Sequence, residues 1–312
     1  MRVLVTGGAG FIGSHLTDAL VARGDEVSVA DDLSTGVAAR VPAGAALHKL
    51  SVTEAGPLGD LVAQERPDLI CHLAAQISVT ASVDNPAGDA LANVVGTVNV
   101  LEASRAAGAR VLLCSTGGAL YGRDAPIPSM EDVLPLPESP YGVAKYCAEQ
   151  YVGLYSRLHG GCHSVLRLAN VYGPRQDPAG ECGVVPIFCA AVAAGRAPTV
   201  YGTGEQTRDY VYVGDVVAAF LAAADRNRPG VWNIGTGAEV SVLDLVGLIS
   251  QVSGRPVEPQ LLPARPGELK RSALDVRRAE RDLGWRARVP LADGLRAVYQ
   301  WIGDGSPDRG AL

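Results

Sequence analysis

The chain has 312 residues, of which 47% are hydrophobic and 19% charged, and this composition excludes an intrinsically disordered protein. The length predicts one large domain with a smaller one beside it. Lysines and arginines number 27 and aspartates and glutamates 33, so the net charge of −6 argues against a general nucleic-acid-binding protein.

Cysteine usage and apolar runs bear on localisation. The six cysteines form no Cys-x-x-Cys pair and are scattered through apolar segments, so we expect buried reduced thiols and no metal site. The longest apolar run, 184–194, contains Pro186 and is too short to span a bilayer. The first residues are typical of a strand and not of a secretory signal. We therefore expect a cytoplasmic protein that does not interact with a membrane.

The first half of the chain alternates predicted strands with predicted helices. Continuous apolar strands separated by helices indicate a parallel sheet that is covered on both faces. We therefore predict an α/β fold, with a Rossmann-type doubly wound domain over residues 1–168. Strands are predicted at 3–6, 27–30, 68–73, 110–115 and 164–168, and helices at 12–22, about 88–107 and 142–158.

The pattern changes after residue 168. Glycine and proline are frequent between 172 and 183, and short strands and helices alternate less regularly up to residue 295. We predict a smaller C-terminal α/β substrate domain over 169–312. Part of it, within 201–233, is expected to return to the first domain, with a strand that rejoins the sheet near 210–213. Residues 303–312 are polar and predict a flexible tail.

A glycine-rich turn follows the first predicted strand, in the sequence T-G-G-A-G-F-I-G at 6–13. Glycines at Gly7, Gly10 and Gly13 let the backbone turn tightly and approach a pyrophosphate, and Phe11 and Ile12 open the helix whose N-terminus offers free N–H groups. The turn therefore predicts a dinucleotide site.

Asp31 follows the second predicted strand, 18 residues after Gly13. A carboxylate at this place accepts hydrogen bonds from a ribose diol and repels a 2′-phosphate, which favours NAD over NADP. His72 and His15 lie on apolar elements, and we interpret both as core residues with satisfied hydrogen bonds.

Tyr141 and Lys145 form a Tyr-x-x-x-Lys pattern at the start of a predicted helix. A spacing of four places both side chains on one face of the helix. A tyrosine normally titrates near 10. The Lys145 ammonium and a positively charged nicotinamide are expected to stabilise the phenolate, which would let Tyr141 act as a base. Ser115 and Thr116 end the strand that precedes this helix.

From residue 1 to about 295 the chain resembles the extended short-chain dehydrogenase/reductase superfamily. Within it the resemblance is to the NAD-dependent epimerase/dehydratase family, in particular to its nucleotide-sugar 4-epimerases. The matching stretches are VTGGAGFIGSHL, HLAAQ, NVVGTVNVLEA, CSTGGALYG, SPYGVAK, RLANVYGPRQDPAGECGVVPIF, YGTGEQTRDYVYVGDV, NIGTG and RPGE followed by LGW.

The resemblance implies catalytic roles for four residues. Tyr141 would be the general base and acid, and Lys145 would hold the nicotinamide ribose and tune Tyr141. Thr116 would hydrogen-bond the sugar hydroxyl that is oxidised. Ser115 is the alternative, because STGGALYG carries one residue more than the commoner form of this motif.

The resemblance also implies binding residues. Leu73, Ala74 and Ala75 match the segment that lines the cofactor, and their small size would let the dinucleotide lie against the sheet edge. Asn93 matches the cofactor-side asparagine, Asn170 the substrate-side asparagine, and Arg208 and Arg265 the arginine pair that grips the substrate diphosphate.

Some positions depart from the family pattern. Ser51 stands where many members carry an aspartate beside the adenine, and its hydroxyl can still accept the adenine amino proton. Asp32 replaces a frequent asparagine, which further disfavours NADP. Gly117 and Gly118 follow Thr116 where dehydratases and related decarboxylases usually carry an acidic residue, and this argues for epimerisation over elimination.

The function implied is 4-epimerisation of a UDP-sugar, UDP-glucose and UDP-galactose foremost, through a transient 4-keto sugar with tightly held NAD. Ser272 stands at the family's gate position, where a small side chain would leave room for an N-acetyl group. The alternatives are another nucleotide sugar (UDP-GlcNAc, UDP-glucuronate or a dTDP-sugar), or a ketoreductase, decarboxylase or dehydratase reaction. The family further implies a homodimer formed through the helices predicted at 88–107 and 142–158.

Overall fold

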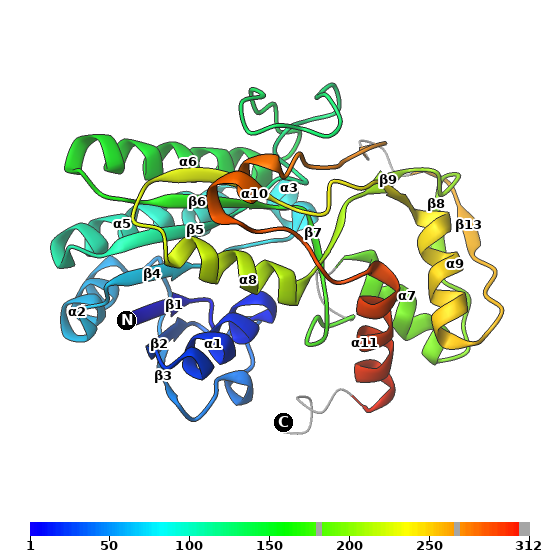
Figure 1. The fold of residues 1–312 in the computed structure, drawn as a ribbon, viewed down its shortest axis with the longest axis horizontal. Helices are drawn as coiled ribbons and strands as arrows, with labels where there is room; N and C mark the ends of the chain where they lie inside the picture. Colours follow the sequence, from blue (N-terminus) through cyan, green and yellow to red (C-terminus); the bar gives the residue numbers. More distant parts are fainter. Residues whose placement is uncertain (179–182, 265–268, 306–312) are drawn as a thin grey trace.

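The computed structural model describes residues 1–178, 183–264 and 269–305 (Figure 1). Its centre is a seven-stranded sheet in the order β11-β6-β5-β4-β1-β2-β3, and every neighbouring pair is parallel. This is the predicted Rossmann-type doubly wound sheet. Its strands are β1 (Arg2–Thr6), β2 (Glu26–Asp31), β3 (Ala45–Lys49), β4 (Leu69–His72), β5 (Arg110–Thr116), β6 (Ser164–Leu168) and β11 (Gly230–Ile234).

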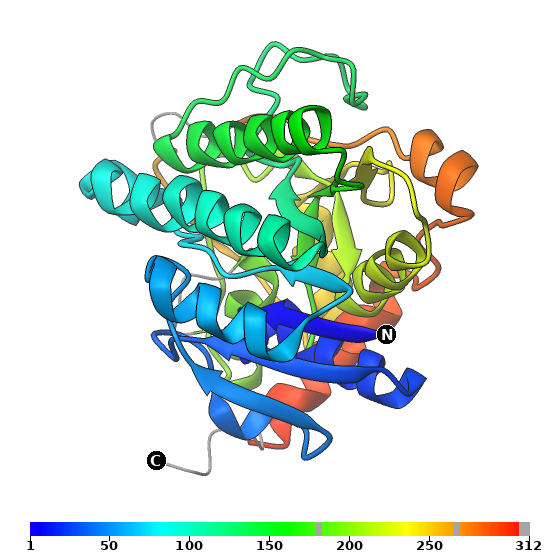
Figure 2. The same ribbon diagram turned by 90° about the vertical axis from the view of Figure 1, so that its left-hand side faces the viewer.

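Helices cover both faces of this sheet, as Figure 2 shows. Because side chains alternate along a strand, Val3 and Val5 of β1 pack toward α1 and α8, whereas Leu4 packs toward α2, α5 and α6. Both faces are therefore dry, which explains why the strands are continuously apolar. The covering helices are α1 (Phe11–Arg23), α8 (Val213–Ala224), α2 (Ala55–Glu65), α5 (Gly96–Ala107) and α6 (Pro140–His159).

Local signals place the ends of these helices. Helix α1 ends at Gly24, whose φ of +87° lies in the left-handed region. Helix α6 begins after Ser139, whose side chain accepts a hydrogen bond from the N–H of Gly142 at 3.1 Å, and Pro140 occupies its first position. The predicted helix at 88–107 is three consecutive pieces. They are α4 (Pro86–Ala90), the π-helical segment η2 (Leu91–Val95) and α5.

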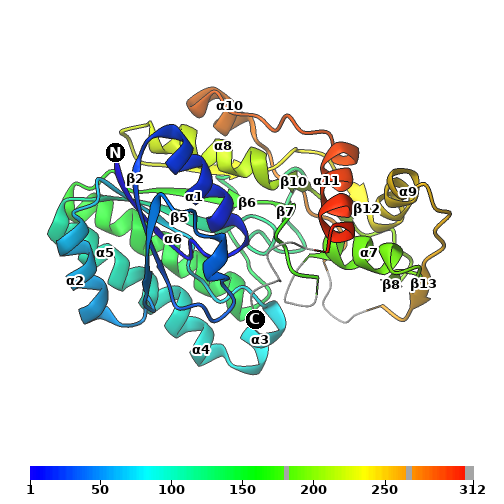
Figure 3. The same cartoon turned by 90° about the horizontal axis from the view of Figure 1, so that it is seen from below.

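A second group of helices stands beside the sheet, on the right of Figure 3. Helices α7 (Val184–Ala193), α9 (Val242–Ser253) and α11 (Leu291–Gly303) pack around a core of their own that includes Phe188, Leu245 and Leu295. The remaining short elements are α3 (Val79–Asp84), α10 (Arg277–Leu283) and η1 (Ala38–Arg40), and the strand pairs β7 (Asn170–Tyr172) with β10 (Tyr210–Tyr212), β9 (Thr207–Arg208) with β12 (Val240–Ser241), and β8 (Thr199–Tyr201) with β13 (Gln260–Leu262).

One predicted element of this part is wrong. We expected the return to the main sheet near 210–213, but β10 pairs with β7 in a separate two-stranded sheet. The strand that rejoins the main sheet is β11, which pairs with β6. Tyr210 and Tyr212 of β10 pack in the core of the second helix group, whereas Trp232 and Ile234 of β11 pack in the core of the main sheet.

The described cysteines, Cys71, Cys114, Cys147, Cys162 and Cys189, are free thiols; Cys71 and Cys189 are buried as predicted, whereas the other three are only partly buried. Cys182 lies outside the described residues, as does 306–312 of the predicted tail. Within the described part of the chain, none of the helices combines the length and apolar character that crossing a bilayer requires.

Candidate active site

The glycine-rich turn lies at the carboxyl edge of the sheet, between β1 and β4, where the strand order reverses. Gly7 has a φ of +71°, and a Cβ there would lie 2.6 Å from the backbone nitrogen of Ala74. A Cβ at Gly13 would lie 2.1 Å from the carbonyl oxygen of Gly7. The turn therefore has no room for side chains at these places, and it brings the N-terminus of α1, capped by Gly10, to the sheet edge.

Asp31 ends β2 beside this turn and is buried. Its carboxylate accepts hydrogen bonds from the N–H groups of Ala9 and Leu33, each at 2.9 Å. Burial raises the pKa of Asp31, and the two N–H groups oppose that rise. The carboxylate is thus held against the turn, at the place predicted for a ribose-binding group.

The other predicted cofactor residues surround the same edge. Leu73 follows β4, where its N–H donates to Thr6 at 3.0 Å, and Ala74 and Ala75 continue past Gly7. Ser51 lies one residue after Leu50, whose N–H donates to the carbonyl of Asp31 at 3.0 Å. Asp32 accepts a hydrogen bond from the N–H of Ser34 at 2.9 Å. Phe11 and Ile12 begin α1, where Phe11 packs edge-on against His15.

Tyr141 and Lys145 lie one turn apart on α6, as their spacing predicts. Lys145 is buried, and its Nζ donates to the carbonyl oxygen of Cys114 at 2.9 Å. Burial lowers the pKa of Lys145, while the charges of Cys114, Glu149 and Asp89 raise it.

The pKa of Tyr141 differs from the expectation. Burial is the largest influence and raises it, the charges of Cys114 and Asp89 raise it further, and a hydrogen bond with Thr116 lowers it. A phenolate near neutral pH therefore needs positive charge beyond what the described side chains supply. An oxidised nicotinamide ring is such a charge.

Of the two candidate hydroxyls that end β5, only Thr116 reaches Tyr141. Ser115 faces the other way and donates to Glu149 Oε1 at 2.5 Å. Ser115 points to the face of the sheet that α6 covers, and Thr116, as the last residue of the strand, lies beside the first turn of α6, which carries Tyr141. The arrangement therefore favours Thr116 for the sugar hydroxyl and gives Ser115 a supporting place.

A buried polar network that the sequence did not reveal begins at Ser115. Glu149 forms an ion pair with Arg167, whose Nη2 lies 2.6 Å from Oε2, and both side chains are buried. Arg167 also donates to the hydroxyl of Tyr121 at 2.9 Å, and this hydroxyl donates to Asn233 at 2.8 Å. Glu149 follows Lys145 by four residues, and this continued spacing was the signal that could have identified it.

Asn93 is buried in η2 and bonded to its neighbours through its NH2 group alone. Its carbonyl oxygen Oδ1 is buried without a hydrogen-bond partner in the described residues, and so is Oδ2 of Asp89. Buried acceptors of this kind call for a donor. Asp89 and its partner Gln76 are further residues that the sequence analysis missed, although Asp89 precedes Asn93 by one helical turn.

The residues predicted for the substrate side lie in different segments of the chain. Asn170 begins β7, its N–H donates to the carbonyl of Asp209 at 2.9 Å, and its Oδ1 lies 3.4 Å from where a Cβ of Gly118 would be. Arg208 is half-buried on β9, and its Nη1 donates to the carbonyl of Thr207 at 2.8 Å. Arg265 lies outside the described residues.

Ser272 is buried two residues before Leu274. The N–H of Leu274 donates to Asp209 at 3.3 Å, and its side chain lies 2.6 Å from where a Cβ of Gly117 would be. Asp209 thus joins the segments that carry Arg208, Asn170 and Ser272. It also accepts hydrogen bonds from Thr236 and Gly237.

His72 is a core residue, as interpreted from the sequence, whereas His15 is only partly buried. His72 is buried, with Nδ1 2.7 Å from the Thr6 hydroxyl and Nε2 3.1 Å from the Thr97 hydroxyl. Burial lowers the pKa of His72 to about 3. His15 Nε2 lies 3.0 Å from the carbonyl oxygen of Pro174.

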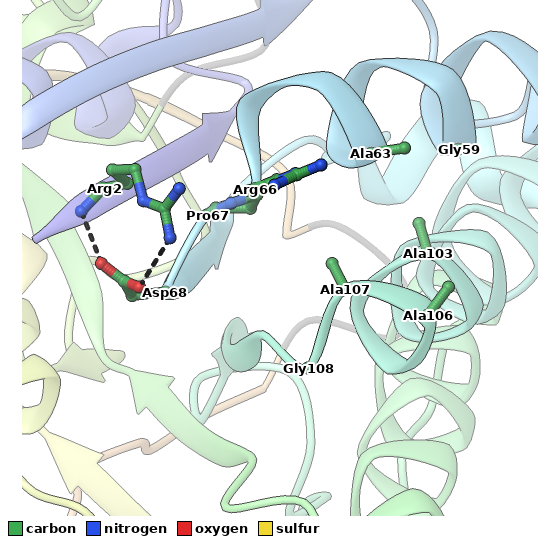
Figure 4. A pocket seen from close by; sticks show the side chains of 10 residues that line it. All are labelled: Arg2, Gly59, Ala63, Arg66, Pro67, Asp68, Ala103, Ala106, Ala107 and Gly108. Carbon is green, nitrogen blue, oxygen red and sulfur yellow. Dashed lines mark hydrogen bonds and ion pairs between the residues drawn. The ribbon is translucent and has the colours of Figure 1, made fainter.

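A cavity of about 410 Å³ lies at the opposite edge of the sheet, between the ends of α2 and α5 (Figure 4). Its polar lining includes Arg2 and Asp68, whose side chains pair at 3.3 Å, together with Arg66. Ligands of doubly wound sheets bind at the carboxyl ends of the strands, and this cavity lies at the amino ends. It is not part of the active site.

The residues at the carboxyl edge fit NAD. The glycines leave no space for a Cβ where a pyrophosphate would pass, and Asn93 Oδ1 is a buried acceptor that lacks a donor. When bound there, the dinucleotide would be held by the turn at its pyrophosphate, by Asp31 at the adenine-side ribose, and by Lys145 and Asn93 at the nicotinamide side.

Comparisons with known proteins identify the family of the chain. A model of the NAD-dependent epimerase/dehydratase family matches residues 3–235. A UDP-glucose 4-epimerase of Mycolicibacterium smegmatis is 46% identical over 308 residues, which are 97% of this chain and 98% of that relative. The crystal structure of a UDP-glucose 4-epimerase from Thermotoga maritima with UDP-glucose has a TM-score of 0.96 and 42% identity, covering 98% of this chain and all of that one.

A Thermus thermophilus UDP-glucose 4-epimerase, crystallised with NAD, has a TM-score of 0.90 and 39% identity, and the match covers 100% of both chains. The fold and the similarity to known proteins therefore agree. The chain belongs to the NAD-dependent epimerase/dehydratase family, whose cofactor is NAD.

Proposed function

We propose that this chain is a nucleotide-sugar 4-epimerase that interconverts UDP-glucose and UDP-galactose with tightly held NAD. The observation that carries the proposal is the placement of the Thr116 hydroxyl beside Tyr141, where it lowers the pKa of the phenol, one helical turn from the buried Lys145. A tyrosine base, a hydroxyl and a cation in this arrangement suit proton removal from a sugar hydroxyl. Similarity to 4-epimerases over nearly the whole chain supports the same reaction.

The chemistry of the site follows from these groups. Tyr141, as the phenolate, takes the proton of the C4 hydroxyl and later returns it, so one residue acts as base and then as acid. Thr116 hydrogen-bonds the same sugar oxygen and keeps it close to Tyr141. NAD, when bound at the residues named above, would supply reversible hydride transfer at C4, which involves no net redox change. Lys145 adds the positive charge that favours the phenolate.

Between the two half-reactions the transient 4-keto sugar rotates, so that its opposite face meets the cofactor, while its nucleotide stays in place. Asn170 and Arg208 are the described residues that we assign to the diphosphate, and Arg265 is assigned by resemblance alone. An arginine fork suits a diphosphate because two N–H donors match two oxygens of the anion. Anchoring the nucleotide lets the sugar rotate without leaving the site.

The glycines after Thr116 favour epimerisation over the elimination, decarboxylation and net reduction alternatives. An acid placed there could expel a sugar hydroxyl, but Gly117 and Gly118 carry no titratable group. A Cβ at Gly117 would lie 2.6 Å from the Leu274 side chain, so an acidic side chain would need that leucine to move. The loop is therefore built without an elimination acid.

Sugar choice is the finer part of the proposal. Ser272 is small and buried beside the Gly117–Leu274 contact, and we propose that it leaves room for an N-acetyl group at C2. UDP-GlcNAc, UDP-glucuronate and dTDP-sugars are the alternative substrates. Ser272→Tyr should reduce turnover of UDP-GalNAc while turnover of UDP-galactose is kept. Equal turnover of the acetylated sugar by both forms would reject this role for Ser272.

We also propose that the chain forms a homodimer through α3, η2 and α6. These neighbouring elements carry large apolar side chains that are more than a third exposed, and a second copy of the same face would cover them. These side chains are Val79, Val83, Leu91, Val95, Val143, Tyr151, Leu154 and Leu158.

The deciding experiment is to incubate the purified protein with UDP-galactose, without added cofactor, and to quantify UDP-glucose by chromatography. Conversion to a stable mixture with no accumulation of NADH is the expected result. Tyr141→Phe is the matched control and should lose activity by about 10²- to 10⁴-fold, the usual contribution of a general acid–base group. Release of CO₂, loss of water or net NADH formation with any nucleotide sugar would point to one of the alternative reactions.

A further inference from the structure

A buried cluster of Gln76, Asp89 and Asn93 adjoins the catalytic pair. Asp89 lies on α4 and Asn93 in η2, and both elements pack against α6, which carries Tyr141 and Lys145. The side chains of Asp89 and Asn93 are each 2% exposed. Nothing in the reaction described above uses Asp89, so its burial needs another reason.

The hydrogen bonds of this cluster allow only one orientation of its amides. Gln76 Nε2 donates to the carbonyl oxygen of Ser78 at 2.9 Å, and Gln76 Oε1 accepts from the N–H of Ser78. Nε2 also donates to Asp89 Oδ1 at 2.8 Å. A backbone carbonyl can only accept and a backbone N–H can only donate, so the Gln76 amide cannot turn over without losing these bonds.

The amide of Asn93 is fixed in the same way. Its Nδ2 donates to the carbonyl oxygen of Gln76 and to Asp89 Oδ1, both at 2.9 Å. Turning this amide by 180° would place Oδ1 against two acceptors, which costs both hydrogen bonds in a buried site. Asn93 Oδ1 is therefore left facing away from Gln76 and Asp89, buried and without a donor in the described residues.

We propose that Asp89 and Gln76 are positioning residues that clamp the amide of Asn93, so that its carbonyl oxygen and not its NH2 group faces a hydroxyl of the nicotinamide ribose. The inference rests on the proposed function for the place of that ribose. It goes beyond it by assigning a task to two residues outside the reacting groups. The clamp selects for a hydroxyl donor, because a buried carbonyl that meets no donor destabilises the bound state.

The clamp can be tested by how fast protein-bound NAD exchanges with isotope-labelled NAD, measured by mass spectrometry on the purified protein. Asp89→Ala removes the acceptor and should speed exchange about tenfold, the value of one hydrogen bond of roughly 1.4 kcal/mol. Asp89→Asn keeps an oxygen that can accept from the same two amides and should restore exchange to within about twofold of the unmodified rate. Asp60→Asn, on the exposed side of α2, is the matched control and should leave exchange unchanged.

A double-mutant cycle separates this clamp from a general structural effect. If Asp89 acts through Asn93, then Asp89→Ala should add nothing to the exchange rate of Asn93→Ala. Gln76→Leu tests the clamp at its partly buried end and should also speed exchange, even where Asp89→Ala fails to fold. Independent, additive effects of Asp89→Ala and Asn93→Ala would overturn the proposal, as would unchanged exchange in both Asp89→Ala and Gln76→Leu.

The double-mutant cycle is independent of the UDP-galactose assay, because NAD exchange is measured without any sugar. A protein that converts no UDP-sugar but shows the expected non-additive exchange would reject the proposed substrate pair and support the clamp. Conversion of UDP-galactose together with additive exchange effects would do the reverse.

Discussion

Ser115 and Thr116 are neighbours in β5, but their hydroxyl groups meet different parts of α6: Ser115 Oγ donates to Glu149 at 2.5 Å, whereas the Thr116 hydroxyl lies beside Tyr141 and lowers its pKa. One strand end therefore serves two purposes. Thr116 lies beside the catalytic tyrosine, and Ser115 joins the buried Glu149–Arg167 ion pair. A shift of register by one residue would exchange these roles.

This division predicts different results for two single substitutions. Thr116→Val should lower kcat about 10²-fold, because the reacting oxygen loses a positioned hydrogen bond, with little change in unfolding temperature. Ser115→Ala should keep kcat within a few-fold but lower the free energy of unfolding by about 1–3 kcal/mol, because buried Glu149 loses a donor. Steady-state kinetics and thermal unfolding of both variants check this, and the opposite pattern would make Ser115 the catalytic hydroxyl.

We expect a side chain introduced into the glycine-rich turn to abolish NAD binding. In Gly13→Ala the new Cβ would lie 2.1 Å from the carbonyl oxygen of Gly7, which must move, and the bound NAD should be lost on purification. Gly247→Ala is the matched control: Gly247 is an exposed position of α9, and a Cβ there would have no atom within 4 Å. It should stabilise the fold by about 0.5–1 kcal/mol and retain NAD. NAD content after denaturation, read by absorbance, distinguishes the two, and a full NAD content in Gly13→Ala would contradict the assignment.

The lowered pKa of buried His72 implies that the free energy of unfolding depends on pH. Burial lowers its folded-state pKa to about 3 from an ordinary value of 6.5. Between these values the unfolded chain binds a proton that the folded chain does not, so the stabilising contribution is complete above pH 6.5 and is lost as the pH falls toward 3. The slope attributable to this residue approaches about 1.4 kcal/mol per pH unit.

Denaturant unfolding at several pH values between 4 and 7 tests this slope. His72→Asn should flatten the dependence by up to that amount, whatever its effect on stability at pH 7, because asparagine does not titrate. His159→Asn, on the exposed end of α6, should leave the slope unchanged. A slope in His72→Asn that equals that of the unmodified protein would show that His72 takes up its proton without unfolding.

If the homodimer forms through the proposed face, then introducing charged side chains there should give a monomer. Leu154→Arg combined with Leu158→Arg places two cations on α6, and both side chains are already 36% and 65% exposed, so the fold should survive. Leu134→Arg is the control in the loop before α6, where the leucine is 67% exposed. Sedimentation should give a monomer for the double variant and a dimer for the control, and a dimer in both would move the interface elsewhere.

The elements found by prediction and those missed differ in a physical way. The strands at the centre of the sheet are apolar on both faces, and they were predicted. Strand β3 (Ala45–Lys49) was missed, because it is an edge strand with partly exposed side chains and no apolar run. Helix α2 was also missed. Gly56, Pro57 and Gly59 lower its intrinsic helix propensity, and burial of its leucines overrides that propensity.

The site was predictable where function needs a short local spacing, as with Tyr141 and Lys145. The supporting groups were not, because their partners are distant in sequence: Arg167 meets Glu149 across 18 residues, and Asn93 meets Gln76 across 17. Hydrogen-bond pairing of this kind depends on the assembled sheet and on which face each side chain takes. Even so, the four-residue step from Lys145 to Glu149 was visible in the sequence.

Segment η2 has a consequence for which changes in length the chain can accept. In it the N–H of Gly96 bonds to the carbonyl of Leu91, five residues back, so the stretch holds one residue more than an α-helix would. Deleting a residue within 91–95 would restore regular α-helix, yet it would rotate everything on one side by about 100° relative to the other. The side chains of α4 before the deletion and of α5 after it would then no longer keep their present faces relative to one another. A deletion that improves the helix would thus remove the site, and homologous chains that keep the chemistry should keep the length of this stretch even where its residues vary.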